Sequence, residues 1–578
     1  MKYTLISPPD DKLTVVEQVL VNRGINLADV SRYLKTTDSE LHNPKLLDFI
    51  EEAAHLFIEH LEKGHKIYVQ VDSDCDGYTS SAFLLNYIWR YNSKYFDQFK
   101  FALHAGKEHG LSKEFVINVE RNEFRLIIVP DAGSNQHEEH RILRDKGIDC
   151  IVLDHHEAHE RSRSASVINP QLDEYPNKQL SGVGIVYKFC KVLDELFGVA
   201  IADQLLDLVA LGMVADMVDM REFETRHLII KGTTNITNPF IKALVERQAY
   251  SMKDGVTPSA LGFYIAPIIN AIIRVGEPEE KILLFSAMLE KYAYKTIPST
   301  KRGAKSGETE TYVEQAVRQG ANIRSRQNRM RDTGLELINN IIKEKKLDEN
   351  KIIIVEVEDI IDKNLSGLIA NQLMYRYQRP VLLLRNTGDG LFQGSGRGYD
   401  KSDLMDLKQF LSDSDLVEYA EGHSNAFGVG ISDKKREELI KYSNEELKSI
   451  DFSPRFLVDF IYEAENINYQ DLMDIGFLKD LWGKGVEEVF VVVKNLKVTK
   501  TNLTLMSPDN SPTLKIQNGL ISFIKFKSSK EEYESLLSDG FISIDLIGKC
   551  TINEWNGNIT PQILVESYEV TGGQKWYF

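Results

Sequence analysis

Three short apolar runs between residues 64 and 156 constrain the fold more than any other feature of the sequence. They read "KIYVQV", "FRLIIVP" and "CIVLD", and helix-like segments separate them. Runs of this length, rich in Val and Ile, are typical of buried strands, and their alternation with helices is typical of a parallel sheet covered on both faces. We therefore expect an α/β domain in which ligands gather beyond the carboxyl ends of the strands.

Acidic residues follow the first run at every second position. They are Asp72, Asp74 and Asp76 in "VDSDCDG". If the backbone stays extended there, the three carboxylates project to one side. The same spacing occurs in calcium loops, but Phe83 stands at loop position twelve, where such a loop needs Glu.

The next two runs end in the same polar manner. Asp131 follows the second, and the third ends on Asp154, His155 and His156. A solvated strand end explains any one of these endings, but three successive strands make a shared site the better interpretation. Asp216, after the apolar helical segment "DLVALGMVA", is a further candidate on a helix end.

Several carboxylates with one or two imidazoles form a ligand set that suits Mn²⁺ or Mg²⁺ better than zinc or copper. Two such ions, ~3.5–4 Å apart, activate water and stabilise an in-line displacement at phosphorus. The strand ends therefore predict a two-metal site for phosphoester chemistry.

Composition sets broader limits. The net charge of -17 counts against a simple electrostatic nucleic-acid binder, although a basic groove can be local. The four cysteines are far apart, so we expect reduced thiols and a cytoplasmic protein. We see no uninterrupted apolar run of ~18 residues and no signal-peptide layout, and expect no membrane partner.

The 578 residues predict several domains. We expect an N-terminal helical segment (1–60), the parallel-sheet domain (61–295), a flexible connector followed by a basic helix (296–344), a second α/β domain (345–435), a helical connector (436–485) and a β-rich barrel or sandwich (486–578). The arginines of the basic helix face either a strand of nucleic acid or solvent.

Four motifs carry a resemblance to a known family. "VDSDCDGYTSS", "VPDAGS", "LDHHE" and "ALGMVADMVDM" resemble the motifs of DHH phosphoesterases. "QGSGRGYD" and "EGHSNAFGVGI" resemble the DHH-associated domain, and the stretch from "LWGKGVEEVFVVVKN" resembles an OB-like domain. Over nearly its full length the chain is similar to the RecJ group of single-strand-specific exonucleases. This resemblance implies a parallel-sheet DHH domain, a smaller α/β DHH-associated domain and a C-terminal OB-like β-barrel.

The resemblance also implies roles at the strand ends. Asp154 would orient a histidine ring, and His156 would meet the scissile phosphate as an electrostatic or acid partner. Asp72 would either bind metal directly or hydrogen-bond a ligand. The implied catalytic residues are His156, Asp154 and Asp131, and the implied ligands of two Mn²⁺ or Mg²⁺ ions are Asp72, Asp74, Asp76, Asp131, His155 and Asp216.

Other implied residues bind the strand. Arg274 would contact phosphate, and Ser395, Arg397, Gly422 and His423 would grip the terminal phosphate, because the planar fork of arginine pairs two phosphate oxygens. On the OB-like domain, bases would stack on aromatic side chains. The candidates for this platform are Phe523, Phe526 and Trp555, for each of which core packing is an equally good explanation.

Several positions depart from the family pattern. Gly398 replaces a serine, Glu421 adds an acid beside the phosphate residues, and bulky Ile272 and Ile273 precede Arg274. We expect such departures in a relative from a phage or mobile element.

The predicted function is a metal-dependent exonuclease that degrades single-stranded DNA to mononucleotides, from the 5′ end as the resemblance implies, in recombination and repair. The alternatives are a DHH phosphodiesterase for oligonucleotides or cyclic dinucleotides, and a non-catalytic scaffold at replication forks. The region 450–578 argues against the first, and the complete set of acids and histidines argues against the second. The candidate protein partners are a single-strand-binding protein and a helicase. The residues alone leave polarity, DNA or RNA preference, the choice of metal and the oligomeric state open.

Overall fold

The computed structural model describes residues 1–106, 108–119, 123–253, 255–555 and 557–574. The chain divides into two compact units. The parallel-sheet unit comprises Ala28–Gln327 and Asp480–Glu487. The mixed-sheet unit comprises Met1–Leu27, Asn328–Lys479 and Glu488–Phe578.

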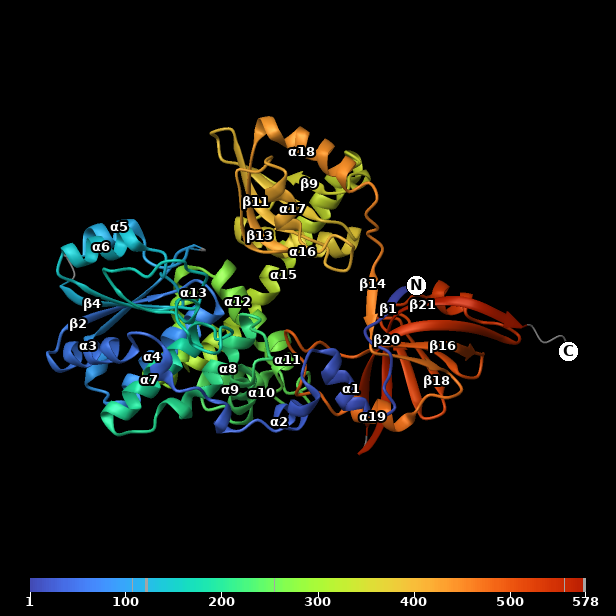
Figure 1. Ribbon diagram of the computed structural model, residues 1–578, viewed down its shortest axis with the longest axis horizontal. Coiled ribbons are helices and arrows are strands. Elements are labelled where there is room, and N and C mark those ends of the chain that lie inside the picture. The colour runs from blue at the N-terminus through green and yellow to red at the C-terminus, as the bar shows by residue number, and fades with distance from the viewer. Residues whose placement is uncertain (107, 120–122, 254, 556, 575–578) are drawn as a thin grey trace. The chain divides into compact units, whose positions relative to one another are not determined.

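The first unit contains the predicted parallel sheet, with strand order β3-β2-β4-β5-β6 and every pairing parallel. Helices α5 and α6 cover one face and α3 and α4 the other (Figure 1). Leu143 of α6 packs with Ile127 and Val152, which explains why the strands read as continuous apolar runs. The bounds are β2 (Lys66–Val71), β3 (Phe99–Leu103), β4 (Phe124–Pro130), β5 (Asp149–Leu153), β6 (Ser166–Ile168), α3 (Ile50–Glu62), α4 (Cys75–Tyr91), α5 (Lys113–Asn118) and α6 (His137–Asp145).

The backbone does not stay extended through Asp72–Asp76, so the condition under which all three carboxylates would project to one side is not met. Asp74 is the N-cap of α4, and its side chain accepts a hydrogen bond from the Gly77 backbone N–H. The helix therefore begins at Cys75, because a capping aspartate favours a helix start over a longer strand.

Helices complete the first unit. They include α7 (Gly182–Phe197), α8 (Leu206–Ala215), α9 (Phe223–Thr234), α11 (Pro258–Ala260), a π-helical turn (Leu261–Ile265) and α12 (Ala266–Val275). In the part of the chain that the structure describes, the helical stretch Pro258–Val275 is long and apolar enough to cross a membrane. It is 56% buried within the protein, and one such helix is weak evidence for a membrane span.

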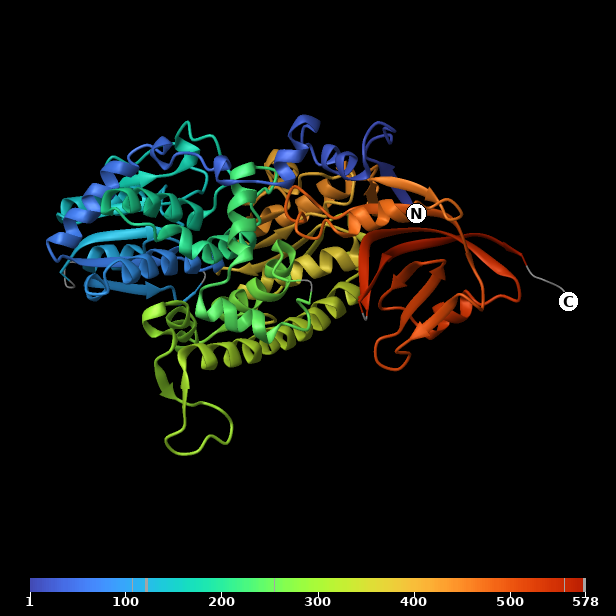
Figure 2. The same cartoon turned by 90° about the horizontal axis from the view of Figure 1, so that it is seen from below.

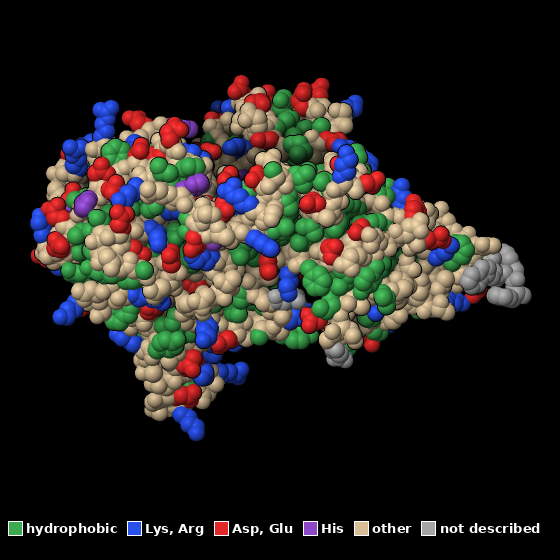
Figure 3. All heavy atoms as spheres, turned by 60° about the horizontal axis from the view of Figure 1, so that its bottom comes forward, with side chains coloured by type: hydrophobic (Ala, Val, Ile, Leu, Met, Phe, Trp, Pro, Cys, Tyr) green, Lys and Arg blue, Asp and Glu red, His purple; other side chains and the backbone are tan. Residues whose placement is uncertain are grey.

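Residues 296–311, which we expected to be a flexible connector, contain an antiparallel hairpin. Strand β7 (Thr296–Pro298) pairs with β8 (Thr309–Thr311), and α15 (Tyr312–Glu344) follows directly. The hairpin projects from the end of α15 (Figure 2). Both basic and acidic side chains lie on this projection (Figure 3).

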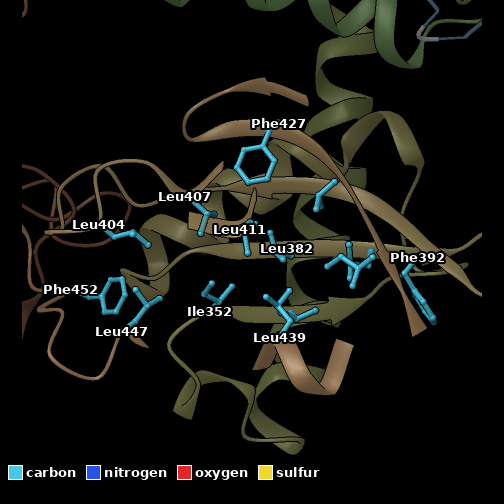
Figure 4. Packing of buried hydrophobic residues seen from close by; sticks show 14 residues of the cluster. Ile352, Leu382, Phe392, Leu404, Leu407, Leu411, Phe427, Leu439, Leu447 and Phe452 are labelled. Atoms are coloured by element: carbon cyan, nitrogen blue, oxygen red, sulfur yellow. The ribbon is translucent and has the colours of Figure 1, made fainter. Parts of the chain in front are cut away.

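The mixed-sheet unit holds a five-stranded sheet of order β12-β13-β11-β10-β9, in which only β9 and β10 are parallel. Its core packs Leu382, Phe427 and Val429 against Leu407 and Leu411 of α17 (Figure 4). The bounds are β9 (Ile353–Glu356), α16 (Ser366–Tyr377), β10 (Val381–Asn386), β11 (Leu391–Arg397), α17 (Leu407–Asp413), β12 (Tyr419–His423) and β13 (Ala426–Ser432).

A seven-stranded sheet of order β15-β16-β20-β21-β19-β18-β17 forms the β-rich C-terminal region. It begins at β15, before the expected boundary at residue 486, because β15 pairs with β16. The OB-like assignment stays a prediction. The bounds are β15 (Phe460–Glu463), β16 (Phe490–Val498), β17 (Leu503–Met506), β18 (Thr513–Asn518), β19 (Ile521–Lys525), β20 (Phe541–Trp555) and β21 (Asn558–Gln574).

We expected residues 1–60 to be helical, but the first residues include a strand. Strand β1 (Lys2–Leu5) precedes α1 (Val15–Asn22) and pairs in parallel with β14 (Arg455–Val458). The N-terminal residues thus belong to the same unit as the C-terminal sheets.

Candidate metal centre and nucleotide-binding residues

The turn from β2 into α4 carries three carboxylates. Asp72 is 1% exposed, and its two oxygens are 2.6 Å from His109 Nδ1 and 2.9 Å from the Gly110 backbone N. Asp74 caps α4, and Asp76 lies in the first turn of the helix. Gly77 is required here, since an added Cβ would lie 2.5 Å from Asp72 Cβ.

The N-terminus of α7 holds Asp76. Its carboxylate accepts hydrogen bonds from the Gly182 backbone N–H (2.6 Å), the Ser181 hydroxyl (3.0 Å) and the Val183 backbone N–H (3.2 Å). A helix N-terminus stabilises a negative charge, so α7 both orients this carboxylate and favours its ionised form.

Asp131 follows β4 in a left-handed backbone conformation, with φ of 64°. Its backbone N–H donates to the Leu153 carbonyl at 2.8 Å, which fixes the turn against β5. A Cβ on Gly182 would lie 2.3 Å from Asp131 Oδ1, so only glycine fits beside this carboxylate. A non-glycine residue with positive φ is uncommon and strained, and such strain clusters at functional sites.

Asp154 organises the residues after β5. Its Oδ1 accepts hydrogen bonds from His156 Nδ1 and the His155 backbone N–H, both at 2.8 Å. Its Oδ2 accepts from the Ser134 backbone N–H at 2.9 Å. With Nδ1 of His156 engaged, the ring presents Nε2 outward, and its side chain is 52% exposed.

The predicted metal ligands lie together. His155 Nε2 is 3.3 Å from Asp131 Oδ1, 3.7 Å from Asp216 Oδ2 and 4.0 Å from Asp76 Oδ2. Asp216 is the C-cap of α8, as expected for a ligand on a helix end. Three overlapping groups, each with ligand atoms within 4.8 Å of one another, have a geometry that can hold a metal ion: Asp131 with His155 and His156, Asp76 with His155 and Asp216, and Asp72 with Asp74 and Asp131.

The crowding of acids raises their pKa values. Burial, together with the charge of Asp74, raises the pKa of Asp76 to about 6. Burial, with the charges of Asp76 and Asp74, raises the pKa of Asp216 to about 8, and the pKa of Asp131 also lies well above its usual range. Like charges at short range disfavour ionisation, so this cluster needs cations to become fully charged.

The donor set fits hard divalent cations. Buried Asp131 Oδ1 accepts no hydrogen bond from the residues that the structure describes. Buried carboxylates are retained where they are paired or coordinate metals. Carboxylate oxygens with one or two imidazoles match Mn²⁺ and Mg²⁺.

Arg274 lies on α12 in the same unit as the acids. Burial lowers the pKa of its guanidinium, and the carboxylate of Asp74 opposes that shift. The structure therefore places this predicted phosphate ligand within electrostatic reach of the acidic cluster.

The other predicted phosphate residues lie on strands β11 and β12, which flank β13 in the mixed sheet. Arg397 and His423 both pair with Ala426, so the two side chains share one face of the sheet. Ser395 and Glu421 both pair with Gly428 and share that face. The four side chains thus lie on one face of the sheet, in two neighbouring cross-strand rows. Gly422 has a positive φ of 127°.

The departure at Gly398 has a structural cause. A Cβ there would lie 1.9 Å from Asn425 Oδ1. That oxygen accepts a hydrogen bond from the Leu407 backbone N–H, and Asn425 Nδ2 donates to the Met405 carbonyl. The asparagine of "GHSNAFG" thus occupies the space that a serine side chain at 398 would need.

Of the three predicted stacking residues, two are available. Trp555 is 71% exposed and Phe526 is 57% exposed. Phe523 is 1% exposed inside the C-terminal sheet, so its prediction as a stacking residue is wrong. The alternation of side chains along a strand did not show whether Phe523 faces the surface or the core. The packing of the side chains places it in the core.

Sequence reasoning gave no site role to His109, Ser134, Ser181 or Gly182. The signal for the last two was available in "LSGVG", a Ser-Gly pair at the start of an apolar helix. No local pattern linked His109 to Asp72, because the two lie 37 residues apart.

Comparisons with known proteins show the family and the fold of the chain. Residues 66–213 match the DHH family, N-terminal domain. YorK, a candidate SPbeta prophage-derived single-strand DNA-specific exonuclease of Bacillus subtilis strain 168, is 38% identical over 99% of this chain and 98% of its own length. The single-stranded-DNA-specific exonuclease RecJ of the same organism is 24% identical over 99% of this chain and 71% of its own length. The crystal structure of RecJ in complex with Mn²⁺ from Thermus thermophilus superposes with a TM-score of 0.72 at 18% identity, over 98% of this chain and 79% of that one, which shows a shared fold.

Proposed function

Because the chain belongs to the RecJ-like family of DHH phosphoesterases, we propose that it is a metal-dependent exonuclease that hydrolyses single-stranded DNA to mononucleotides. The observation that carries this proposal is the meeting of Asp76, Asp131, His155 and Asp216 around one point. Strand ends that are merely solvated would not bury carboxylates against one another.

Two Mn²⁺ or Mg²⁺ ions are the cofactors we propose, held by Asp72, Asp74, Asp76, Asp131, His155 and Asp216. When bound, such a pair lowers the pKa of a water molecule and neutralises charge at the phosphate oxygens. Asp72, which is held by His109 and Gly110, orients the others or supplies one ligand atom.

His156 and Asp154 act together beside these ligands. Burial alone would lower the pKa of His156, but the hydrogen bond and charge of Asp154 raise it to about 9. The ring is then cationic at neutral pH and faces the scissile phosphate as an electrostatic partner. As water oxygen joins phosphorus and loses one proton to solvent, the bond between phosphorus and the leaving sugar oxygen breaks. His156 Nε2–H can donate the proton that this sugar oxygen takes up.

The proposed grip on the terminal phosphate is formed by Ser395, Arg397 and His423, which lie on one face of the mixed sheet. A grip on the 5′ end gives 5′→3′ polarity. Arg274 is the proposed phosphate contact beside the acids. We propose one function for each of three predicted domains. Residues 61–295 catalyse hydrolysis, residues 345–435 bind the terminal phosphate, and residues 486–578 bind the DNA strand. Phe526 and Trp555 are the stacking candidates in the last region. The proposed setting is DNA recombination and repair.

The test uses single strands labelled at the 5′ or the 3′ end, with Mn²⁺, for the full chain and for Asp131→Ala. We expect metal-dependent release of the 5′ label first and its loss in the variant. Asp145→Ala is the matched control, since this exposed residue on α6 pairs with Arg141 and lies outside the cluster. Equal activity of the Asp131 variant would refute the proposal, and release of the 3′ label first would refute only the polarity.

Terminal recognition is tested separately. Arg397→Ala is expected to abolish any preference for a 5′-phosphate over a 5′-hydroxyl end, because its guanidinium is the cation among the residues proposed to grip this phosphate. Arg376→Ala, on the exposed surface of α16, is the control. A preference that survives in the Arg397 variant would remove this residue from the phosphate site.

A further inference from the structure

A cavity of about 480 Å³ is lined by Met217, the residue that follows the candidate metal ligand Asp216. Four chain segments build it: the end of α8 with the residues that follow, α9 at Ile229, the α11 region, and a loop from residue 482. All four belong to the parallel-sheet unit. The lining residues include Val214, Met217, Met220, Gly262, Phe263 and Trp482.

Large apolar side chains are exposed at the mouth of this cavity. Phe263 is 78% exposed and Met217 is 64% exposed. Met217 directly follows Asp216 and has a positive φ of 58°. Exposed apolar side chains gathered around a concavity mark binding sites, whereas isolated ones need no explanation.

Backbone contacts fix the shape of the cavity. The Met220 N–H donates to the Lys484 carbonyl at 2.9 Å, and the Ser259 hydroxyl donates to the Trp482 carbonyl at 3.1 Å. A Cβ on Gly483 would lie 2.1 Å from Met220 Sδ, so the two segments approach as closely as they can. The cavity is therefore a built feature and not a gap between mobile loops.

The backbone near Phe263 is also unusual. The residue lies in the π-helical turn Leu261–Ile265, which interrupts the helical stretch that carries Arg274. π-Helical turns are rare and occur frequently at functional sites. At this turn an aromatic ring faces solvent beside the cavity instead of packing into the core.

We propose that this cavity binds a nucleobase of the strand whose phosphate lies at the acidic cluster, with Phe263 and Met217 against the face of the base. The inference rests on the proposed function and deepens it. Asp216 and Met217 are consecutive, so a phosphate at one and the base of a neighbouring nucleotide at the other are within the reach of one strand. Stacking on an aromatic ring tolerates any base, which suits an enzyme that degrades strands of any sequence.

The cavity also gives the parallel-sheet unit its own means of selecting single strands. In a duplex the base faces are stacked on their neighbours and the edges are paired, so entry costs unstacking and unpairing energy. In a single strand that cost is small. Selection would thus not depend on the C-terminal sheet alone.

The test compares degradation of strands that carry one abasic site, moved stepwise from the end that is degraded first, by the full chain and by Phe263→Ala. We expect the unchanged chain to prefer the intact strand about tenfold in kcat/KM when the abasic site lies at the nucleotide that enters the cavity. Phe263→Ala should lose this preference while retaining activity on the abasic strand. Tyr250→Ala, which removes an aromatic ring that is 97% exposed and outside the cavity, should behave like the unchanged chain.

A second readout is independent of activity. Without metal, strands with 2-aminopurine at that nucleotide should change fluorescence on binding the unchanged chain and the Tyr250 variant, but not the Phe263 variant. If no strand is degraded with Mn²⁺, the proposed function fails, and the fluorescence still reports the cavity. If strands are degraded and the Phe263 variant keeps both the base preference and the fluorescence change, only the inference is overturned.

Discussion

Asp154 and His140 show opposite ways in which single residues respond to burial. Asp154 keeps its charge, because hydrogen bonds from His155, His156 and Ser134 outweigh the cost of burial and hold its pKa well below the usual range. His140 is 0% exposed, and neither ring nitrogen has a hydrogen-bond partner among the described residues. Burial lowers its pKa to about 4. The surroundings of Asp154 therefore favour its charged form, and those of His140 favour its neutral form.

Asp154→Asn should lower Mn²⁺ affinity and activity about 10–100-fold, because the amide removes the negative charge and keeps only one acceptor oxygen. Either the histidines or the Ser134 N–H would then face an NH2 donor. Isothermal titration with Mn²⁺ measures the affinity, and thermal unfolding checks the fold. Asp149→Asn, at the exposed start of the same strand, is the control. An affinity equal to that of the unchanged chain would contradict the assigned role.

His140→Leu should make the protein less sensitive to acid. As pH falls from 6.5 towards 4, the unfolded chain binds a proton at this residue and the folded chain does not, so stability is lost with falling pH. The loss of unfolding free energy from pH 7 to pH 5 should be smaller by ~2 kcal/mol in the variant. Urea unfolding at the two pH values measures it, with exposed His137→Leu on the same helix as control. An identical loss in the His140 variant would contradict the prediction.

At the scale of elements, the candidate metal centre is built by helices α7 and α8 as well as by the strand ends. The N-terminus of α7 donates hydrogen bonds to Asp76, and the end of α8 presents Asp216. Glycines allow this approach: a Cβ on Gly212 would lie 2.5 Å from Asp76 Oδ1. The centre therefore depends on how closely these helices pack against α4.

Gly182→Ala and Gly184→Ala both place a methyl group on α7. Comparing them separates the effect of contact with the metal centre from the general effect of alanine in this helix. At 182 the methyl group would displace Asp131, so we expect weaker Mn²⁺ binding and activity at least about tenfold lower. At 184 the nearest atoms belong to the Leu180 side chain, from 3.2 Å at its Cβ, and not to a metal ligand, so we expect both properties to stay near those of the unchanged chain. Metal titration of both variants measures the difference. Equal effects would mean that the contact with Asp131 does not position the ligand.

At the scale of the whole molecule, the first residues are anchored to distant parts of the mixed-sheet unit. Arg23 forms a two-pronged ion pair with Asp459, at 2.7 and 2.9 Å, and Asp459 is fully buried. Strand β1 pairs with β14, which ends at the residue before Asp459. A segment and a sheet more than 400 residues apart along the chain thus fold as one body.

Arg23→Ala should destabilise the mixed-sheet unit by about 3–5 kcal/mol, because it leaves a buried carboxylate without its cation. Lys2→Ala, which removes an exposed pair with Asp451, should cost less than about 1 kcal/mol. Chemical unfolding gives both values, and hydrogen exchange at β1 shows whether the segment detaches. Costs of equal size would contradict the difference in burial between the two pairs.

The sequence by itself determined the parallel sheet, the acids and histidines at its strand ends and the family. These features depend on the local spacing of apolar residues and on residue type, which a short stretch of sequence contains. Only the tertiary structure decided that α4 begins at Cys75, that His109 holds Asp72, that Asn425 takes the space beside Gly398, and that Phe523 is buried. It also brought the loop from Trp482 against Met217 and Phe263 to form the cavity. These relations join residues far apart along the chain, and their geometry follows from packing, which no local pattern contains.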